Sequence, residues 1–329
     1  NFHSTYSGAA SRHLPEAEDI VNLKEVAYPV LLFDRVTMGH RGEPLARIQT
    51  ATKCGYGCGF CATSRVLGPQ TRAKVSEVIE FIEGMLSRGV HNFYFEDATF
   101  AIDKIGKGIF TQDKMEDGKP VLLQKYPGWT DAFLEAMNKI QKKNSQKGIR
   151  VRFGIQTRID TLLSDEFVHE LAQAGCTTVF LGVETLNRDA LISMHKGTTN
   201  AESTITGVFE RLSRFGVNAS VALITGRYTG SISDFEYTLT RLSELNVPEI
   251  FIQAAAVYPG TDDWKNLDED DKRNVVLSYL CPNFSASRVS VKGVNPEDQM
   301  QYGIDGPKEL EAHYQTAVTI LSKKFHKLN

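Results

Sequence analysis

The chain has 329 residues, a formal net charge of −3 and 41% hydrophobic residues. These values are ordinary for a globular protein, and the slightly acidic balance gives no basic footprint for nucleic acid. No run approaches the roughly 18 apolar residues that a membrane-spanning helix requires. The five cysteines do not form a disulfide framework. We therefore expect a cytoplasmic protein with no membrane segment and no nucleic-acid partner.

The first informative stretch lies after an irregular lead-in over residues 1–44. An apolar alternation at 46–51 predicts a strand, and a glycine-rich loop with Cys54, Cys58 and Cys61 follows it. The glycines between the cysteines let the backbone fold tightly, so three thiolates can converge on one metal centre from a single loop.

The number of cysteines indicates the kind of metal centre. A closed structural zinc site requires a fourth Cys or His nearby, and none follows the loop in the usual spacing. Three cysteines around a four-iron cluster instead leave one iron open to an external ligand, as a catalytic site requires. The loop therefore predicts a [4Fe-4S] cluster rather than zinc.

Strands and helices alternate from residue 46 to residue 262. Counting the strand at Ile48, we expect six parallel strands with right-handed helical connections. The pattern predicts an α/β fold, a partial (three-quarter) TIM-type barrel with its chemistry at the carboxyl ends of the strands. Further strands are expected near 91–97, 150–156, 177–184, 217–224 and 249–254, and helices near 74–88, 130–143, 187–195, 201–214 and 231–245, with another that Ser164 caps.

Two segments interrupt this alternation. Residues 102–130 are rich in glycine and proline and form either a substrate cover or a mobile surface excursion. Beyond residue 262 the pattern weakens, and Pro307 opens a final helix. We therefore divide the chain into a lead-in (1–44), a core barrel (45–262) and a C-terminal helical extension (263–329).

The cysteine spacing, with the aromatic Phe60 before the third cysteine, resembles the signature of the radical S-adenosylmethionine (radical SAM) superfamily. Segments 181–184, 194–198 and 258–261 resemble the branch that contains oxygen-independent coproporphyrinogen oxidase, the methylthiotransferases and the cobalamin-binding members. The resemblance implies an enzyme that cleaves SAM reductively at a [4Fe-4S] cluster. The 5′-deoxyadenosyl radical would abstract hydrogen from a small-molecule or natural-product-type substrate, and a flavodoxin-type or ferredoxin-type donor would supply electrons.

The same resemblance assigns roles to individual residues. Glu96 and Asp97 would hold the methionyl amino group of SAM, Glu184 would meet its ribose, and Lys196 would pair with its carboxylate. Ala222 stands where some members carry an acid, so a second ribose contact is not expected. Further candidates at the cofactor site are Phe60, Gln156, Arg158 and Tyr258, and Cys281 is a candidate hydrogen donor for which a structural role is the simpler interpretation.

Three other functions stay open. The first is a cobalamin-dependent radical SAM methyltransferase whose cobalamin domain is absent from this chain. The second is a tRNA-modifying radical SAM enzyme, which the acidic balance and the lack of a basic appended domain disfavour. The third is an electron-transfer or regulatory iron–sulfur protein, which normally uses a fourth cysteine.

Overall fold

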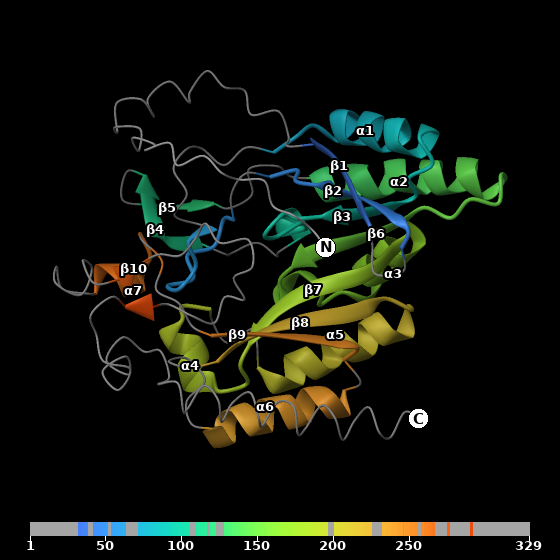
Figure 1. Ribbon diagram of the computed structural model, residues 1–329. Coiled ribbons are helices and arrows are strands. Elements are labelled where there is room, and N and C mark those ends of the chain that lie inside the picture. Colours follow the sequence, from blue (N-terminus) through green and yellow to red (C-terminus); the bar gives the residue numbers. More distant parts are fainter. Residues whose placement is uncertain are drawn as a thin grey trace.

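The centre of the fold is a seven-stranded sheet (Figure 1). Six of its strands are parallel and follow one another across the sheet in chain order, with helices between them. They confirm the expected partial TIM-type barrel. The parallel strands are β2 (Pro44–Ile48), β3 (Asn92–Phe95), β6 (Arg152–Thr157), β7 (Cys176–Glu184), β8 (Asn218–Thr225) and β9 (Glu249–Ala254).

The protein is represented by a computed structural model. It describes residues 32–38, 42–51, 54–63, 72–104, 110–116, 119–122, 128–196, 201–225, 232–245, 247–254, 258, 260–266, 275–276 and 290–291. In this part of the chain, no helix has the length and apolar character needed to cross a membrane.

The longer helices lie on one side of the sheet, and the expected helices are found within a few residues of their predicted positions (Figure 1). Ser164 caps α3 as predicted, because its hydroxyl accepts a hydrogen bond of 3.3 Å from the amide of Phe167. The helices are α1 (Val75–Ser87), α2 (Trp129–Ser145), α3 (Asp165–Gln173), α4 (Arg188–Ser193), α5 (Glu202–Arg214), α6 (Ile232–Glu244) and α7 (Asp262–Lys265), with short 3₁₀ turns η3 (Ile102–Lys104) and η4 (Ile159–Thr161).

The hydrophobic core lies between the sheet and the helices. Alternate strand residues point to opposite faces of a sheet, and the buried set packs against the helices. Phe95 of β3, for example, lies 5.2 Å from Phe133 of α2 and 5.8 Å from Phe153 of β6, measured between ring centroids. We call the opposite face, turned away from the helices, the inner face. Its side chains are small, polar or half-exposed, so it is available for binding.

Three regions differ from the sequence-based expectation of irregular structure. Strand β1 (Leu32–Met38), within the lead-in, pairs antiparallel with β2 at the sheet edge. The insertion contains an antiparallel pair, β4 (Phe110–Glu116) and β5 (Lys119–Leu122). In the extension, β10 (Val275–Val276) pairs with β11 (Ser290–Val291). Cys281 and the helix expected after Pro307 lie outside the described residues, and the proposed domain boundaries remain predictions.

Two glycines with positive φ angles provide a matched test of this packing. A Cβ atom at Gly175, where φ is +102°, would lie 2.0 Å from Nε2 of Gln141 and 2.7 Å from the carbonyl oxygen of Val151. That amide nitrogen donates to the carbonyls of Val151 (2.6 Å) and Ala174 (2.9 Å), so it cannot move without losing both bonds. At Gly216, where φ is +70°, a Cβ would meet nothing within 4 Å.

We expect Gly216→Ala to lower the free energy of unfolding by about 1–2 kcal/mol, because a left-handed backbone is unfavourable for alanine. Gly175→Ala should lower it by about 1–3 kcal/mol more, because of crowding. Urea unfolding followed by circular dichroism measures both values. Equal losses in the two variants would contradict the packing described around Gly175.

Candidate active site

The cysteine loop begins at the carboxyl end of β2, where Asp97 holds the chain. The Asp97 carboxylate is fully buried and accepts hydrogen bonds from the amides of Thr50 (2.5 Å) and Ala51 (2.9 Å) and from the Thr50 hydroxyl. Burial raises the pKa of Asp97, while Arg72, 4.0 Å away, and these hydrogen bonds act to lower it. Asp97 therefore sets the direction in which the chain leaves β2.

The far end of the loop is held by two other segments. The Gly59 amide donates to the carbonyl of Met194 (2.9 Å) at the end of α4, and the Gly59 carbonyl accepts from the amide of Asp262 (3.0 Å) at the start of α7. Phe60, which the sequence marks as a cofactor-site candidate, packs against Met194 together with Ala190 and Ile224. The loop thus bridges the segments that follow β7 and β9.

Cys54, Cys58 and Cys61 carry free thiols on this loop. Burial raises the pKa values of Cys54 and Cys58, and Cys54 Sγ lies 3.5 Å from the Thr99 hydroxyl. No three His, Cys, Asp or Glu side chains among the described residues are arranged to hold a single ion. A four-iron cluster binds each thiolate through a different iron, so its cysteines are spaced more widely than the ligands of one ion. Cysteine thiolates are the donors that such a cluster uses, and metal coordination deprotonates thiols outright. The three cysteines of the loop therefore fit a four-iron cluster.

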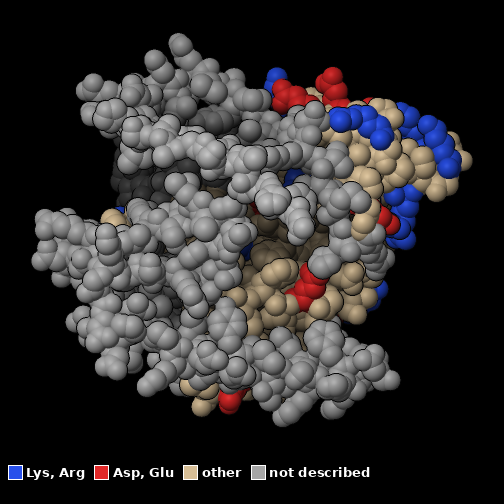
Figure 2. All heavy atoms as spheres, in the orientation of Figure 1, with Lys and Arg blue, Asp and Glu red and all other residues tan. Residues whose placement is uncertain are grey.

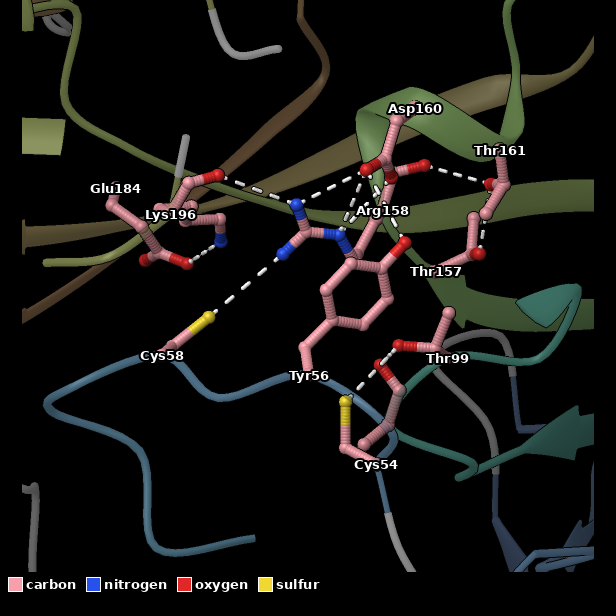
Figure 3. Close-up of polar contacts among 11 residues, drawn as sticks. Cys54, Tyr56, Cys58, Thr99, Thr157, Arg158, Asp160, Thr161, Glu184 and Lys196 are labelled. Carbon is pink, nitrogen blue, oxygen red and sulfur yellow. Dashed lines mark hydrogen bonds and ion pairs between the residues drawn. The ribbon is translucent and has the colours of Figure 1, made fainter. Parts of the chain in front are cut away.

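Arg158, which follows β6, contacts the cysteine loop (Figure 3). Its Nε and Nη2 donate to the Asp160 carboxylate at 3.0 and 3.1 Å, and its guanidinium lies 3.7 Å from the ring centroid of Tyr56. Its Nη1 lies 3.8 Å from Cys58 Sγ, and its Nη2 lies 3.4 Å from the carbonyl oxygen of Lys196. A buried cation is therefore fixed beside one of the predicted cluster ligands.

Glu184 and Lys196 form an ion pair with each other at the end of β7 (Figure 3). Both side chains are buried, with 8% and 6% exposed. A bulge between Gly182 and Glu184 and the left-handed backbone of Glu184 (φ 64°) direct its carboxylate toward Lys196. A Cβ atom at Gly182 would collide with both groups, at 2.4 Å and 2.7 Å. The structure thus places the two residues together, and their contacts with SAM remain predictions.

The remaining candidates lie around the same edge. Glu96 pairs with Arg47 of β2, and Gln156 makes a side-chain hydrogen bond with Tyr94. The carbonyl of Tyr258 accepts from the amide and hydroxyl of Thr261, the residue that caps α7. Burial raises the pKa of Tyr258, as does the nearby charge of Cys61. Each of the three residues is near the cysteine loop or on the inner face, and their contacts with a cofactor stay predictions.

Three residues of the site were not anticipated from the sequence. Tyr56 stacks on Arg158, Asp160 binds both of them, and Thr99 contacts Cys54. The available signals were weak: an aromatic residue between two cysteines, and an acid two positions after a strand-end arginine. Both features are also common at ordinary surface turns, so the sequence alone does not mark these residues as part of the site. Their contacts in the structure do.

We expect Cys54→Ala, Cys58→Ala and Cys61→Ala each to abolish cluster binding after anaerobic reconstitution, whereas the wild type should bind about four irons per chain. Cys176→Ala is the matched control, since Cys176 is buried in the core and burial raises its pKa to about 12. Iron content and visible absorbance measure the result. Retention of the cluster by any of the three loop variants would contradict the assigned ligand set.

The buried ion pair provides a second test. Lys196→Ala would leave the Glu184 carboxylate buried without its cation, which should lower the free energy of unfolding by about 3–5 kcal/mol. Lys139→Ala removes a pair whose side chains are 74% and 71% exposed and should leave stability nearly unchanged. Urea unfolding of the metal-free protein compares them. Similar stabilities for the two variants would show that the Glu184–Lys196 pair is not buried in solution.

Comparison with known proteins agrees with this geometry. The model of the Radical SAM superfamily matches residues 48–242. The chain is 22% identical over 247 residues to the hopanoid C-2 methylase of Rhodopseudomonas palustris (strain TIE-1), covering 73% of this chain and 42% of that protein. It is 24% identical over 228 residues to the hopanoid C-3 methylase of Methylococcus capsulatus (strain ATCC 33009 / NCIMB 11132 / Bath), covering 68% and 36%.

Among solved structures, the radical S-adenosylmethionine methyltransferase TsrM from Kitasatospora setae, with cobalamin and a [4Fe-4S] cluster bound, has a similar fold. The TM-score is 0.51 at 16% identity, over 68% of this chain and 39% of that one. The chain spans less than half the length of the curated relatives it matches. The superfamily match covers more than half of the 329 residues and includes the last residue of β2, the cysteine loop and the whole of β3, β6, β7 and β8. The chain therefore belongs to the radical SAM superfamily.

Proposed function

We propose that this chain is the radical-generating core of a methylase that acts on a small molecule with a largely apolar body. As a member of the superfamily, it is an enzyme that uses a [4Fe-4S] cluster and SAM. The observation that carries the proposal is the agreement between the two curated relatives, both named as methylases, which match 73% and 68% of this chain. Because the structure of TsrM, which has a similar fold, holds cobalamin, a requirement for cobalamin belongs to the same proposal.

An aromatic surface on the inner face supports an apolar substrate. Phe180 of β7 and Phe251 of β9 lie 5.5 Å apart between ring centroids, in an edge-to-face arrangement. Phe251 is 48% exposed, which is unusual for a large apolar side chain. Gly182 and Ala222 lie in register with Phe251 and add little bulk beside it. These strands therefore present apolar surface on the inner face.

Polar side chains occupy the neighbouring strands of the inner face. The Arg47 guanidinium lies 6.0 Å from the Tyr94 ring centroid and pairs with Glu96. Burial raises the pKa of Tyr94, and the charges of Glu96 and Glu249 also raise it. Since Glu249 belongs to β9 and Tyr94 to β3, polar groups from both sides of the barrel face a common space. A substrate with an apolar body and one polar end fits this division.

The methylase proposal predicts transfer of an isotope label. Reconstituted protein, reduced with dithionite, is supplied with SAM carrying a deuterated methyl group and with a lipid extract, with and without methylcobalamin. We expect a deuterated methyl group to appear in a component of the extract. Formation of 5′-deoxyadenosine with no label transfer under any condition would instead indicate hydrogen abstraction without methylation. Replacing dithionite by a flavodoxin-type or ferredoxin-type protein tests the proposed electron donor.

Two exposed aromatic residues provide the matched variants for this assay. Phe251→Ala should lower label transfer by about twofold to tenfold, the loss expected for an aromatic contact of about 0.5–1.5 kcal/mol. Tyr237 on α6 is 50% exposed and lies on the helical side, so Tyr237→Ala should leave label transfer unchanged. An equal effect of the two substitutions would exclude the aromatic surface as the substrate site.

A further inference from the structure

We propose that Arg158 is a positioning residue for the cluster: with Tyr56 and Asp160 it clamps the cysteine loop and holds a positive charge at Cys58, which raises the cluster's reduction potential. This role does not depend on methyl transfer. It differs from a direct contact with the SAM carboxylate, the other role open to a strand-end arginine at this edge of the barrel.

The donors of Arg158 are already engaged within the protein. All three of its nitrogens have partners: Nε and Nη2 donate to Asp160, Nη2 also reaches the Lys196 carbonyl, and Nη1 points to Cys58. The residue is only 9% exposed. Arginine binds a ligand carboxylate best through two parallel N–H groups. Here that paired geometry is used on Asp160, so a SAM carboxylate would have to displace a buried internal partner.

Stacking ties Arg158 to the loop itself. Tyr56 lies between Cys54 and Cys58, its ring centroid is 3.7 Å from the Arg158 guanidinium, and its hydroxyl donates to Asp160 at 3.3 Å. The three side chains therefore form a closed unit in which each contacts the other two (Figure 3). Only a planar guanidinium can stack on the ring and bind the carboxylate at the same time. The unit fixes the middle of the loop against the end of β6.

The charge of Arg158 acts on Cys58. Arg158 Nη1 lies 3.8 Å from Cys58 Sγ, so the cation is close enough to favour a negative sulfur. Reduction adds negative charge to a cluster, and nearby cations and N–H groups directed at its sulfurs stabilise the reduced form. Loss of the Arg158 charge should therefore make the cluster harder to reduce, while loss of the Asp160 charge should make it easier.

The test uses reconstituted holoprotein without SAM, with the midpoint potential measured by redox titration followed by electron paramagnetic resonance. In Arg158→Met we expect the ratio of reduced to oxidised cluster at a fixed potential to fall about tenfold, a shift of 59 mV to more negative values for one electron. Asp160→Asn should shift the potential in the opposite direction. Arg152→Met is the matched control, because Arg152 is in the same strand but pairs with Glu43 at the other end, and it should leave the potential unchanged.

Titration of each reduced variant with SAM separates the two roles of Arg158. We expect Arg158→Met to bind SAM within about threefold of wild type. A wild-type potential with a tenfold or greater loss of SAM affinity would overturn the proposal and identify Arg158 as a SAM contact. If Arg158→Met binds no iron, its clamping role is supported and Asp160→Asn decides the electrostatic role. A potential for Asp160→Asn that is unchanged or more negative would then refute it.

Discussion

The buried carboxylate of Asp97 is the interaction on which the position of the cysteine loop depends. A buried charge is unfavourable unless its oxygens are hydrogen-bonded, and Asp97 meets this condition with two backbone amides, one hydroxyl and the nearby Arg72. Arg72 in turn stacks 3.5 Å from the ring centroid of Trp129, at the start of α2. Moving the start of the loop would therefore leave the buried Asp97 carboxylate without its hydrogen-bond donors.

The same logic applies on the other side of the loop, where two buried ion pairs face Cys58. Glu184 pairs with Lys196, and Arg158 pairs with Asp160. Buried pairs contribute little net stability, but each side chain is held in one orientation because separating a pair leaves a buried charge. SAM carries both an ammonium and a carboxylate. If the roles that the resemblance implies hold, Lys196 would exchange Glu184 for the SAM carboxylate, and Glu184 would accept hydrogen bonds from the ribose hydroxyls.

The two faces of the sheet have different roles: one packs against the helices and forms the core, and the inner face is the one proposed to bind the substrate. Most large apolar residues pack against the helices, whereas the inner face has small residues, polar residues and the aromatic pair Phe180 and Phe251. Gly182 shows why this matters, since a Cβ atom there would occupy the space that Glu184 and Lys196 share. The helical face therefore maintains the fold, and the small residues of the inner face keep space for the site.

Local patterns determined the barrel and the cluster loop from the sequence alone. The alternation of strands and helices, the cap at Ser164 and the cysteine spacing are properties of neighbouring residues, so they can be read without a structure. The placement of aromatic and polar side chains on the inner face, and the contacts of Arg158, depend on residues far apart in the chain. Tyr56 and Asp160 are separated by 104 positions, and Cys58 and Arg158 by 100. Only the tertiary structure decided those contacts, because parallel strands bring their carboxyl ends to one edge regardless of distance along the chain.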